Sequence, residues 1–370
     1  MAAELMIEWL LVIPFLFYVA FFLTALRKFP GKTGSGRKTA GSGTRVSVVI
    51  PCRNEEDNLP GILGTIASQN LPASEFEVIV VDDNSTDATF AVASAFKGIS
   101  GYSVLRNKGH GKKRAILTGV EASGSELILT TDADCRPSPS WLTSFSTLYD
   151  ARKPAMIIGP VKLAESKGLL YIFQQAEWLG LQGLTAGLAE AGSPVMCNGA
   201  NLGFRRDLFL NNYNLLKEKI PSGDDMFLLH AARQDKNNRI IWLHNPEGSV
   251  VTPPAGSLTA LLRQRARWIS KAGAYRDLPV ILLSATVFLS VATLGYLEVA
   301  TIFNIRLLPL LAACFILKNA ADIPLIHRAG RFFGQKPCTG LVMLLQLIYP
   351  FYLTGVLFSL FPGMHRWKNG

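Results

Sequence analysis

The sequence of 370 residues contains few charged residues and no paired cysteines. Charged residues make up 17% of the chain and hydrophobic residues 49%, a balance that excludes a disordered protein and argues against a purely soluble one. There is no Cys-x-x-Cys pair, which excludes a disulfide framework and a cysteine-rich zinc site and is typical of a reducing compartment. The five cysteines are Cys52, Cys135, Cys197, Cys314 and Cys338.

Acidic residues are nearly absent from three short stretches, which hold the whole basic excess of the chain. Residues 27–45 contain six basic and no acidic residues, residues 263–276 five and none, and residues 318–336 four and one. These stretches sum to +14, and the whole chain carries a formal +10, so the remainder carries −4. Each stretch flanks an apolar segment. The pattern therefore predicts membrane boundaries and contact with membrane lipids rather than a nucleic-acid-binding face.

Residues 9–26 contain no charged residue, and this length is enough for a transmembrane helix. A cleaved signal peptide is the alternative, but Glu4 and Glu8 replace the expected positive charges and no small-residue cleavage site is present. We expect a membrane anchor over residues 1–29 and a flexible basic linker over residues 30–45. The basic residues that follow the anchor predict that the next region lies in the cytoplasm.

From residue 46 to about residue 251, short β-rich segments alternate with amphipathic helical segments. This alternation predicts an α/β fold with a parallel, doubly wound sheet, whose ligands bind at the carboxyl ends of the strands. We expect this domain to cover residues 46–276. The expected strands are 46–50, 77–81, 126–131, 155–159 and 239–243, and the expected helices are 58–69, 87–97 and 112–122.

Residues 277–370 form an expected C-terminal transmembrane region. Segments 278–297 and 341–360 are long enough to span a membrane, whereas segment 307–317 is short and could be interfacial or re-entrant. The basic segment 318–336 is expected to be a cytoplasmic loop. Earlier in the chain, residues 169–191 have apolar residues at helical spacing, which fits a buried core helix and an interfacial helix equally well.

Two aspartates follow the strand expected at residues 126–131. In an extended backbone residues i and i+2 point the same way, so Asp132 and Asp134 can present both carboxylates to one site. Oxygen ligands at a strand end suit Mg²⁺ or Mn²⁺, with phosphate oxygens completing the coordination. A turn is the alternative, since aspartate is common in turns and Pro137 follows closely.

Polar residues also follow the first two expected strands. Asp83 comes directly after the second strand, where a carboxylate can accept a hydrogen bond from a ribose hydroxyl or a base N–H. The same segment could simply cap the next helix through Ser85 or Asp87. The end of the first strand lies in the same layer and supplies the candidate nucleotide-binding residues Pro51, Arg53 and Glu55.

Glycines and cations precede the helix expected at residues 112–122. The segment Gly-His-Gly-Lys-Lys-Arg, residues 109–114, combines them with a helix N-terminus, which favours binding of a diphosphate, with Lys112 as the candidate cation. The segment does not match the Walker A pattern. A solvated helix start is the alternative.

Two further motifs lie near the end of the α/β region. Asp224 and Asp225 open a helical segment, where acidic residues favour the helix dipole and where a carboxylate could also act as a general base. The segment Gln-Arg-Ala-Arg-Trp, residues 264–268, precedes the apolar region and could mark the membrane boundary.

Taken in order, these motifs resemble the membrane-bound family 2 glycosyltransferases of the GT-A fold, a group that includes the cellulose, hyaluronan and poly-N-acetylglucosamine synthases. The resemblance covers residues 46–268 and implies a Rossmann-like nucleotide-diphospho-sugar transferase domain. The matching segments are VSVVIPCRNEE, VDDNSTD, GKKRAI, TDAD, NGANLGFR, GDD and QRARW.

The resemblance also implies roles for individual residues. Asp83 would hold the uracil and ribose, and Asp132 and Asp134 would bind the nucleotide and a divalent ion. Asp225 would be the catalytic base; many members have Thr-Glu-Asp where this chain has Gly-Asp-Asp, a departure shared with some members. The nucleotide diphosphate and acceptor would be covered by Gln264, Arg267 and Trp268, and the acceptor side would be lined by Asn198, Gly199, Asn201 and Asp224.

These roles predict an inverting transfer of a sugar from a nucleotide-diphosphate sugar, expected to be a UDP-sugar. The ion, Lys112 and Arg267 would stabilise the leaving group while Asp225 deprotonates the acceptor hydroxyl. The expected acceptor is a lipid or a glycan at the cytoplasmic face of the inner (plasma) membrane, in the synthesis of an envelope glycan or glycolipid. Two alternatives are a processive polysaccharide synthase that translocates its product and a non-catalytic membrane scaffold.

Overall fold

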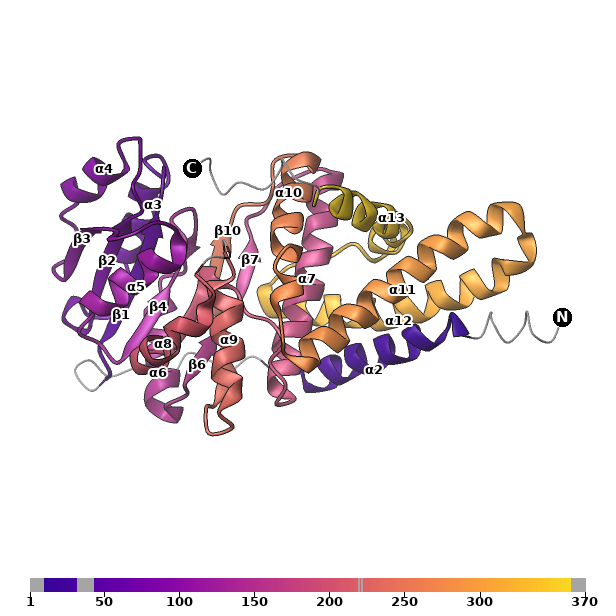
Figure 1. The fold of residues 1–370 in the computed structure, drawn as a ribbon, viewed down its shortest axis with the longest axis horizontal. Helices are drawn as coiled ribbons and strands as arrows, with labels where there is room; N and C mark the ends of the chain where they lie inside the picture. Colours follow the sequence, from indigo (N-terminus) through magenta and orange to yellow (C-terminus); the bar gives the residue numbers. More distant parts are fainter. Residues whose placement is uncertain (1–9, 32–42, 219, 221, 361–370) are drawn as a thin grey trace. The chain divides into compact units, whose positions relative to one another are not determined.

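The computed structural model describes residues 10–31, 43–218, 220 and 222–360, and the chain divides into two compact units. The mixed unit comprises residues 31–164 and 196–253 and contains the strands. The helical unit comprises the chain up to residue 30, residues 165–195 and the chain from residue 254. Two segments of the expected 46–276 domain, 165–195 and 254–276, therefore belong to the helical unit. Figure 1 labels the elements of both units.

A seven-stranded sheet forms the centre of the mixed unit, in the order β3-β2-β1-β4-β8-β6-β9. The first four strands in chain order run parallel, β8 runs antiparallel to both of its neighbours, and β9 is parallel to β6. The strands are β1 (Val46–Cys52), β2 (Phe76–Asp82), β3 (Tyr102–Arg106), β4 (Leu127–Thr130), β6 (Met156–Ile158), β8 (Leu202–Arg205) and β9 (Ile240–Trp242).

The five predicted strands are confirmed as β1, β2, β4, β6 and β9, but the prediction of a wholly parallel sheet is wrong. The antiparallel strand β8 contains no β-branched residue, so its sequence Leu-Gly-Phe-Arg gave no strand signal. Its place in the sheet is set by pairing with β4 on one side and β6 on the other.

Helices cover both faces of this sheet, which explains why every residue of β1 is buried. One face packs against α5 (Lys112–Ala122) through Ile79, Val81 and Ala115. The other face packs against α3 (Leu59–Ala67), α4 (Thr89–Ala95) and α6 (Trp141–Arg152) in one large apolar core. The predicted helices over 58–69, 87–97 and 112–122 are confirmed as α3, α4 and α5.

The remaining elements of the mixed unit lie beside this sheet. A small second sheet has the order β5-β10-β7 and consists of β5 (Arg136–Pro137), β7 (Val161–Leu163) and β10 (Val250–Thr252). β5 begins only two residues after Asp134, so this sheet fixes the chain just beyond the predicted metal ligands. Two further helices, α8 (Arg206–Asn212) and α9 (Asp224–Gln234), follow β8.

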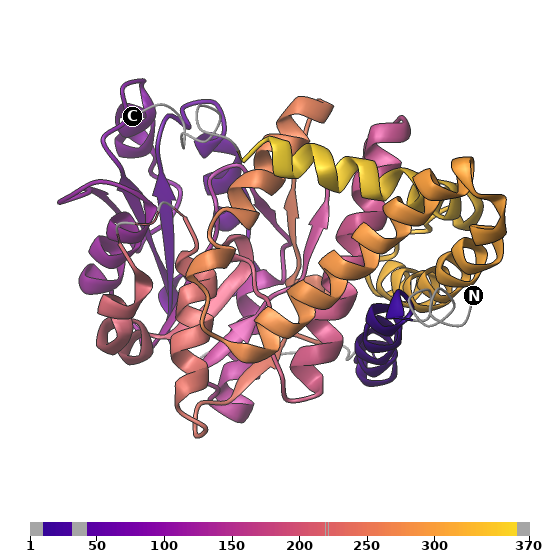
Figure 2. The same cartoon turned by 45° about the vertical axis from the view of Figure 1, so that its right-hand side comes forward.

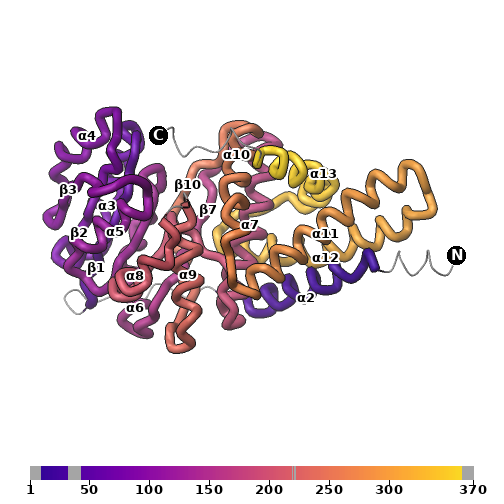
Figure 3. The backbone as a smooth tube through the Cα atoms, viewed as in Figure 1, coloured from indigo at the N-terminus to yellow at the C-terminus, as the bar shows by residue number. Residues whose placement is uncertain are grey.

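The helical unit contains three helices that are long and apolar enough to cross a membrane among the described residues. These candidate spans are Leu278–Phe303, Ile305–Phe333 and Thr339–Phe358. They correspond to α11 (Leu278–Phe303), to α12 (Leu308–Phe333) with the short turn before it, and to α13 (Thr339–Phe358). Figure 3 shows α11 and α12 as two long helices joined by a tight turn.

The predictions of a short apolar piece at 307–317 and a loop at 318–336 are wrong, because one helix continues to Phe333. The apolar sequence ends near Leu317 because the next turns carry polar side chains that face the interior of the unit. Lys318, Asn319 and Asp322 are all buried there. The Lys318 Nζ lies 2.6 Å from the Asp322 Oδ2, so the two charges neutralise each other inside the helix.

The other helices of this unit are α2 (Ile13–Lys28), α7 (Leu169–Glu190) and α10 (Leu258–Ile269). α2 packs against α7, α11 and α12, and Figure 2 shows α2 in indigo beside the orange helices. The Tyr18 hydroxyl of α2 donates a hydrogen bond to Asp322 Oδ1 at 2.6 Å. The start of the predicted anchor, Trp9, lies outside the described residues. α7 is mostly buried between α2, α12 and α13, which favours the core-helix interpretation over the interfacial one.

Candidate functional site

The predicted metal ligands lie directly after β4 in the mixed unit. One donor atom each from Asp132, Asp134 and Cys135 lies within 4.8 Å of the others, close enough to hold one ion. Burial, reinforced by the charge of Asp132, raises the pKa of the Asp134 carboxyl. A bound cation would therefore stabilise the ionised form of Asp134. Burial also raises the pKa of the Cys135 thiol, which leaves the two carboxylates as the main ligands for Mg²⁺ or Mn²⁺.

Sequence reasoning missed Cys135 as a possible third donor. Its distance from the other cysteines suggested no metal site, although it stands next to Asp134 in the sequence. Its backbone N–H donates to the Asp132 carbonyl at 3.1 Å, a tight turn that brings the thiol back toward the carboxylates.

Lys112 links the end of β4 to the start of α9. It is the first residue of α5, and the preceding Gly111 has a φ of 90°, a conformation that favours glycine. The Lys112 Nζ lies 2.6 Å from Asp132 Oδ1 and 3.9 Å from Asp224 Oδ2. Burial alone would lower the pKa of Lys112, but these two carboxylates outweigh it and raise the pKa above its usual value. Lys112 is therefore an ammonium ion at neutral pH.

The predicted catalytic base and acceptor residues meet at the start of α9. The Asp225 Oδ2 accepts a hydrogen bond from the Gly199 backbone N–H at 3.0 Å, and its Oδ1 accepts one from the Met226 N–H at 2.7 Å. A Cβ at position 199 would lie 3.2 Å from Asp224 Oδ2 and 3.6 Å from Asp225 Cβ, so glycine lets this loop approach the helix closely. The Asn198 side chain accepts from the Ala200 N–H at 2.9 Å and holds the turn.

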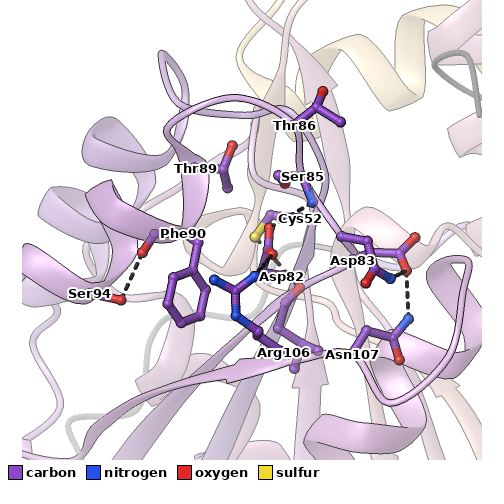
Figure 4. A network of polar contacts seen from close by, with 12 residues as sticks. Cys52, Asp82, Asp83, Ser85, Thr86, Thr89, Phe90, Ser94, Arg106 and Asn107 are labelled. Carbon is purple, nitrogen blue, oxygen red and sulfur yellow. Dashed lines mark hydrogen bonds and ion pairs between the residues drawn. The ribbon is translucent and has the colours of Figure 1, made fainter.

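Asp83 lies at the end of β2, beside the start of α5, and is 1% exposed. Each of its carboxylate oxygens lies 2.9 Å from the Gly111 N, and Oδ1 also accepts from the Asn107 side-chain amide at 2.6 Å (Figure 4). A carboxylate has about four lone-pair positions, so these contacts orient Asp83 and leave capacity for a ligand. The Gly111 N–H, expected to face a diphosphate, is engaged by Asp83 instead.

The neighbouring Asp82 is also buried. Figure 4 shows Arg106 beside it, with NH1 3.8 Å from Asp82 Oδ2 and the guanidinium 3.8 Å from the centre of the Phe90 ring.

The end of β1 carries the other predicted nucleotide-binding residues. Pro51 is buried within β1 and pairs with Val81 of β2, so it shapes the strand. Arg53 and Glu55 follow the strand and are half-buried, and the Glu55 Oε2 accepts from the Asn58 side chain at 2.7 Å. The charge of Glu55 also contributes, after burial and Asp132, to the raised pKa of Asp134, which associates Glu55 with the metal ligands.

The prediction that Asn201 lines the acceptor side is wrong. The residue is 0% exposed, and its amide is fully used by the protein. Its Oδ1 accepts from the Trp141 indole N–H at 2.8 Å, and its Nδ2 donates to the carbonyls of Pro160 and Gly248 at 2.7 and 3.0 Å. Asn201 therefore joins β8 to α6 and to the loops beside the second sheet. Asn198 and Gly199 remain beside Asp224 and Asp225.

Gln264, Arg267 and Trp268 lie on α10 in the helical unit. Sequence reasoning passed over the residue between them, Arg265, which is buried and holds α10 in place. Its NH2 lies 2.6 Å from the Glu177 Oε2 of α7, and its guanidinium lies 4.2 Å from the centre of the Trp268 ring. The sequence feature that could have revealed this ion pair is Glu177, a charged residue in the middle of an apolar helical segment.

The Arg265–Glu177 pair is completed from α13. The Tyr352 hydroxyl donates to the Glu177 Oε1 at 3.1 Å, so Glu177 connects three helices. Burial alone would lower the pKa of Arg265, but the Glu177 carboxylate outweighs it and raises the pKa, so the Arg265 guanidinium stays charged. The segment that carries Trp268 is thus anchored by a desolvated ion pair.

Comparisons with known proteins match part of the sequence and the fold. Residues 47–211 match the family model described as Glycosyl transferase family 2. Over 98 residues the chain is 38% identical to an undecaprenyl-phosphate 4-deoxy-4-formamido-L-arabinose transferase of Aeromonas hydrophila, which covers 25% of this chain and 30% of that protein. Over 259 residues it is 27% identical to an N-acetylglucosaminyltransferase of Sinorhizobium fredii, which covers 64% of this chain and 60% of that protein. The chain therefore spans less than two thirds of either relative.

A solved structure resembles nearly the whole chain. The mannosyltransferase from Pyrobaculum calidifontis in complex with GDP-Man and Mn²⁺ matches with a TM-score of 0.57 and 19% sequence identity. The match covers 97% of this chain and 96% of that one. The likeness concerns the fold, and it agrees with the mixed sheet and with the helices that follow it.

Proposed function

We propose that this chain is a membrane-bound family 2 glycosyltransferase that transfers a sugar from a nucleotide-diphosphate sugar to a lipid or glycan acceptor with inversion. The match of residues 47–211 to the family model, the GT-A-like fold and the three candidate spans support the proposal. The observation that carries the proposal is the contact of Lys112 with both Asp132 and Asp224, at 2.6 and 3.9 Å. It connects the predicted metal ligand Asp132 to the start of α9, where Asp224 stands next to Asp225, the predicted base.

Each group in this site has a chemical task. A divalent ion held by Asp132 and Asp134 supplies positive charge to the diphosphate leaving group, and Lys112 adds to it. Asp83, oriented by Gly111 and Asn107, binds the nucleoside. Asp225 accepts the proton of the acceptor hydroxyl at a carboxylate oxygen, beside the loop that carries Asn198 and Gly199. The roles predicted for Gln264, Arg267 and Trp268 of α10 stay predictions, because these residues belong to the helical unit.

The acceptor is proposed to be lipid-linked or a growing glycan. The name of one relative includes undecaprenyl phosphate, which supports a lipid-linked acceptor, whereas the name of the other gives the transferred group, N-acetylglucosaminyl, and no acceptor. A processive synthase that translocates its product is the second candidate. Three candidate spans among the described residues are few for a polymer channel, which favours single transfer or an oligomeric channel. The intact acidic residues argue against a non-catalytic scaffold.

The donor can be identified by a screen of UDP-sugars and GDP-sugars with purified protein in detergent. We expect release of UDP and formation of a small glycolipid or glycan in the presence of Mn²⁺ or Mg²⁺. Product size separates single transfer from processive synthesis. Absence of turnover with every donor and with extracted membrane lipids would contradict the proposed activity.

A change at Asp134 tests the metal assignment. We expect Asp134→Ala to abolish divalent-dependent binding of the nucleotide sugar while the melting temperature stays close to that of the wild type, because Asp134 follows a strand and is not part of the apolar core. Calorimetry with and without EDTA measures both effects. Unchanged affinity in the variant, together with no effect of EDTA on the wild type, would rule out the assignment.

The mixed unit is proposed to face the cytoplasm at the inner (plasma) membrane, because a basic cluster follows the first apolar segment. Ser100 is exposed in a turn of this unit and serves as a reporter. In a Cys338→Ser background, Ser100→Cys should react with a membrane-impermeant maleimide in inside-out vesicles and remain unlabelled in intact cells. Labelling in intact cells would place the unit on the other side.

A further inference from the structure

Lys112 lies between two carboxylates that have different predicted tasks. Its ammonium group is 2.6 Å from Asp132 Oδ1, on the metal side, and 3.9 Å from Asp224 Oδ2, on the acceptor side. The Lys112 side chain is 20% exposed, so it is held by these charges rather than by water.

Asp132 therefore has two possible cationic partners. Its carboxylate is also one of the three groups whose donor atoms lie within 4.8 Å of one another and could hold a divalent ion. An ion bound there would meet the ammonium group of Lys112 at close range. Two cations this close in a partly buried setting repel each other, and Lys112 must leave Asp132 before an ion binds at full strength.

We propose that Lys112 competes with the divalent ion for Asp132 and that the donor diphosphate decides the competition. Without nucleotide, Lys112 holds Asp132 and weakens the binding of free ion. A diphosphate offers the ammonium group another anionic partner, so Lys112 releases Asp132 when the nucleotide and the ion arrive together. Lys112 returns to Asp132 once the nucleoside diphosphate leaves. The release of Asp132 on nucleotide binding rests on the proposed function, whereas the competition between Lys112 and the ion rests on the distances alone.

The competition predicts an increase in affinity when a positive residue is removed. Mn²⁺ binding without nucleotide is measured by the electron paramagnetic resonance signal of free Mn²⁺, with full-length protein in detergent. We expect Lys112→Met to bind Mn²⁺ at Asp132 and Asp134 about tenfold more tightly than the wild type, at the low end of what one charge at 4–6 Å does to a carboxylate. The matched control is Lys108→Met, which removes the same charge from an exposed residue four positions earlier and should leave Mn²⁺ affinity unchanged.

Addition of UDP should reverse the order of the two proteins. In the wild type, UDP and Mn²⁺ should each tighten the binding of the other by the same large factor, as linkage requires, and in Lys112→Met this factor should be more than tenfold smaller. Equal or weaker Mn²⁺ binding by Lys112→Met, or no Mn²⁺ binding by either protein, would overturn the competition. Tighter Mn²⁺ binding by the variant, with no binding of UDP to either protein, would instead uphold the competition and overturn the nucleotide assignment. Lys112→Gln repeats the test if Lys112→Met does not fold.

Discussion

Replacement of Asp225 by asparagine is expected to lower the rate of sugar transfer by about 10² to 10⁴-fold, the usual loss when a general base is removed. An amide has nearly the shape of a carboxylate but cannot accept a proton at neutral pH. Donor affinity should stay near that of the wild type, because the diphosphate is proposed to be held by the metal ligands and Lys112. Transfer rate, donor affinity by calorimetry and melting temperature are measured on the same preparation.

The structure adds a control to this experiment. Both oxygens of Asp225 accept backbone hydrogen bonds, from Gly199 and from Met226, and an asparagine can accept only one of them. A stability loss of about 1–3 kcal/mol from the unpaired N–H is therefore expected, and it must not be mistaken for catalysis. Asp224→Asn removes a charge beside Lys112 from the same helix end and should have a smaller effect on the rate.

If both aspartates merely favour a helix N-terminus, the lost charge should add about 0.3–1 kcal/mol to the cost of each change and leave transfer intact. Wild-type turnover by a folded Asp225→Asn protein would remove Asp225 from the catalytic mechanism.

Glu177→Gln should lower the free energy of unfolding of the helical unit by about 3–5 kcal/mol, because it leaves the buried guanidinium of Arg265 without its counter-charge. The same change should impair transfer, since Arg265 packs against Trp268 on the helix that carries Gln264 and Arg267. Thermal unfolding in detergent and the transfer rate measure the two effects separately.

A double variant separates stability from positioning. Glu177→Leu with Arg265→Met replaces the ion pair by apolar side chains of similar size, which is often neutral or stabilising. We expect this protein to regain the melting temperature but not the transfer rate, because Trp268 has lost the cation above its ring. The buried Lys318–Asp322 pair serves as a comparison, and the corresponding Lys318→Met with Asp322→Leu protein should keep its transfer rate. Full recovery of the transfer rate in the Glu177–Arg265 double variant would show that the pair has only a structural role.

The parts of the fold that follow from local pattern were predictable. Buried parallel strands such as β2 and β4 are continuous β-branched and apolar segments, and the aspartates that follow them could be read from the sequence. β8 was not predictable, because its four residues carry no such pattern and its direction depends on the neighbours β4 and β6.

The same limit applies to single side chains. Asn201 belongs to a motif of the family, yet its amide is consumed by Trp141, Pro160 and Gly248, which are distant in sequence. Lys318 and Asp322 ended the apolar pattern and suggested a loop, although they pair four residues apart within one helix. In each case the role of a side chain depends on its partner. For Asn201 the partners lie in other segments of the chain, so the local sequence does not reveal them.

The hydrogen bond between Tyr18 and Asp322 joins residues 304 positions apart, and this has a consequence for biogenesis. At about 5–20 residues per second, a ribosome needs roughly 15–60 s to travel from one to the other. During that time α2 has left the ribosome, but its partner helix α12 has not yet been synthesised. When α12 follows, Lys318 and Asp322 can neutralise each other within it, so this pair adds no net charge to the apolar part of the helix. The helical unit can therefore be assembled only after residues 31–164 and 196–253 of the mixed unit have been synthesised.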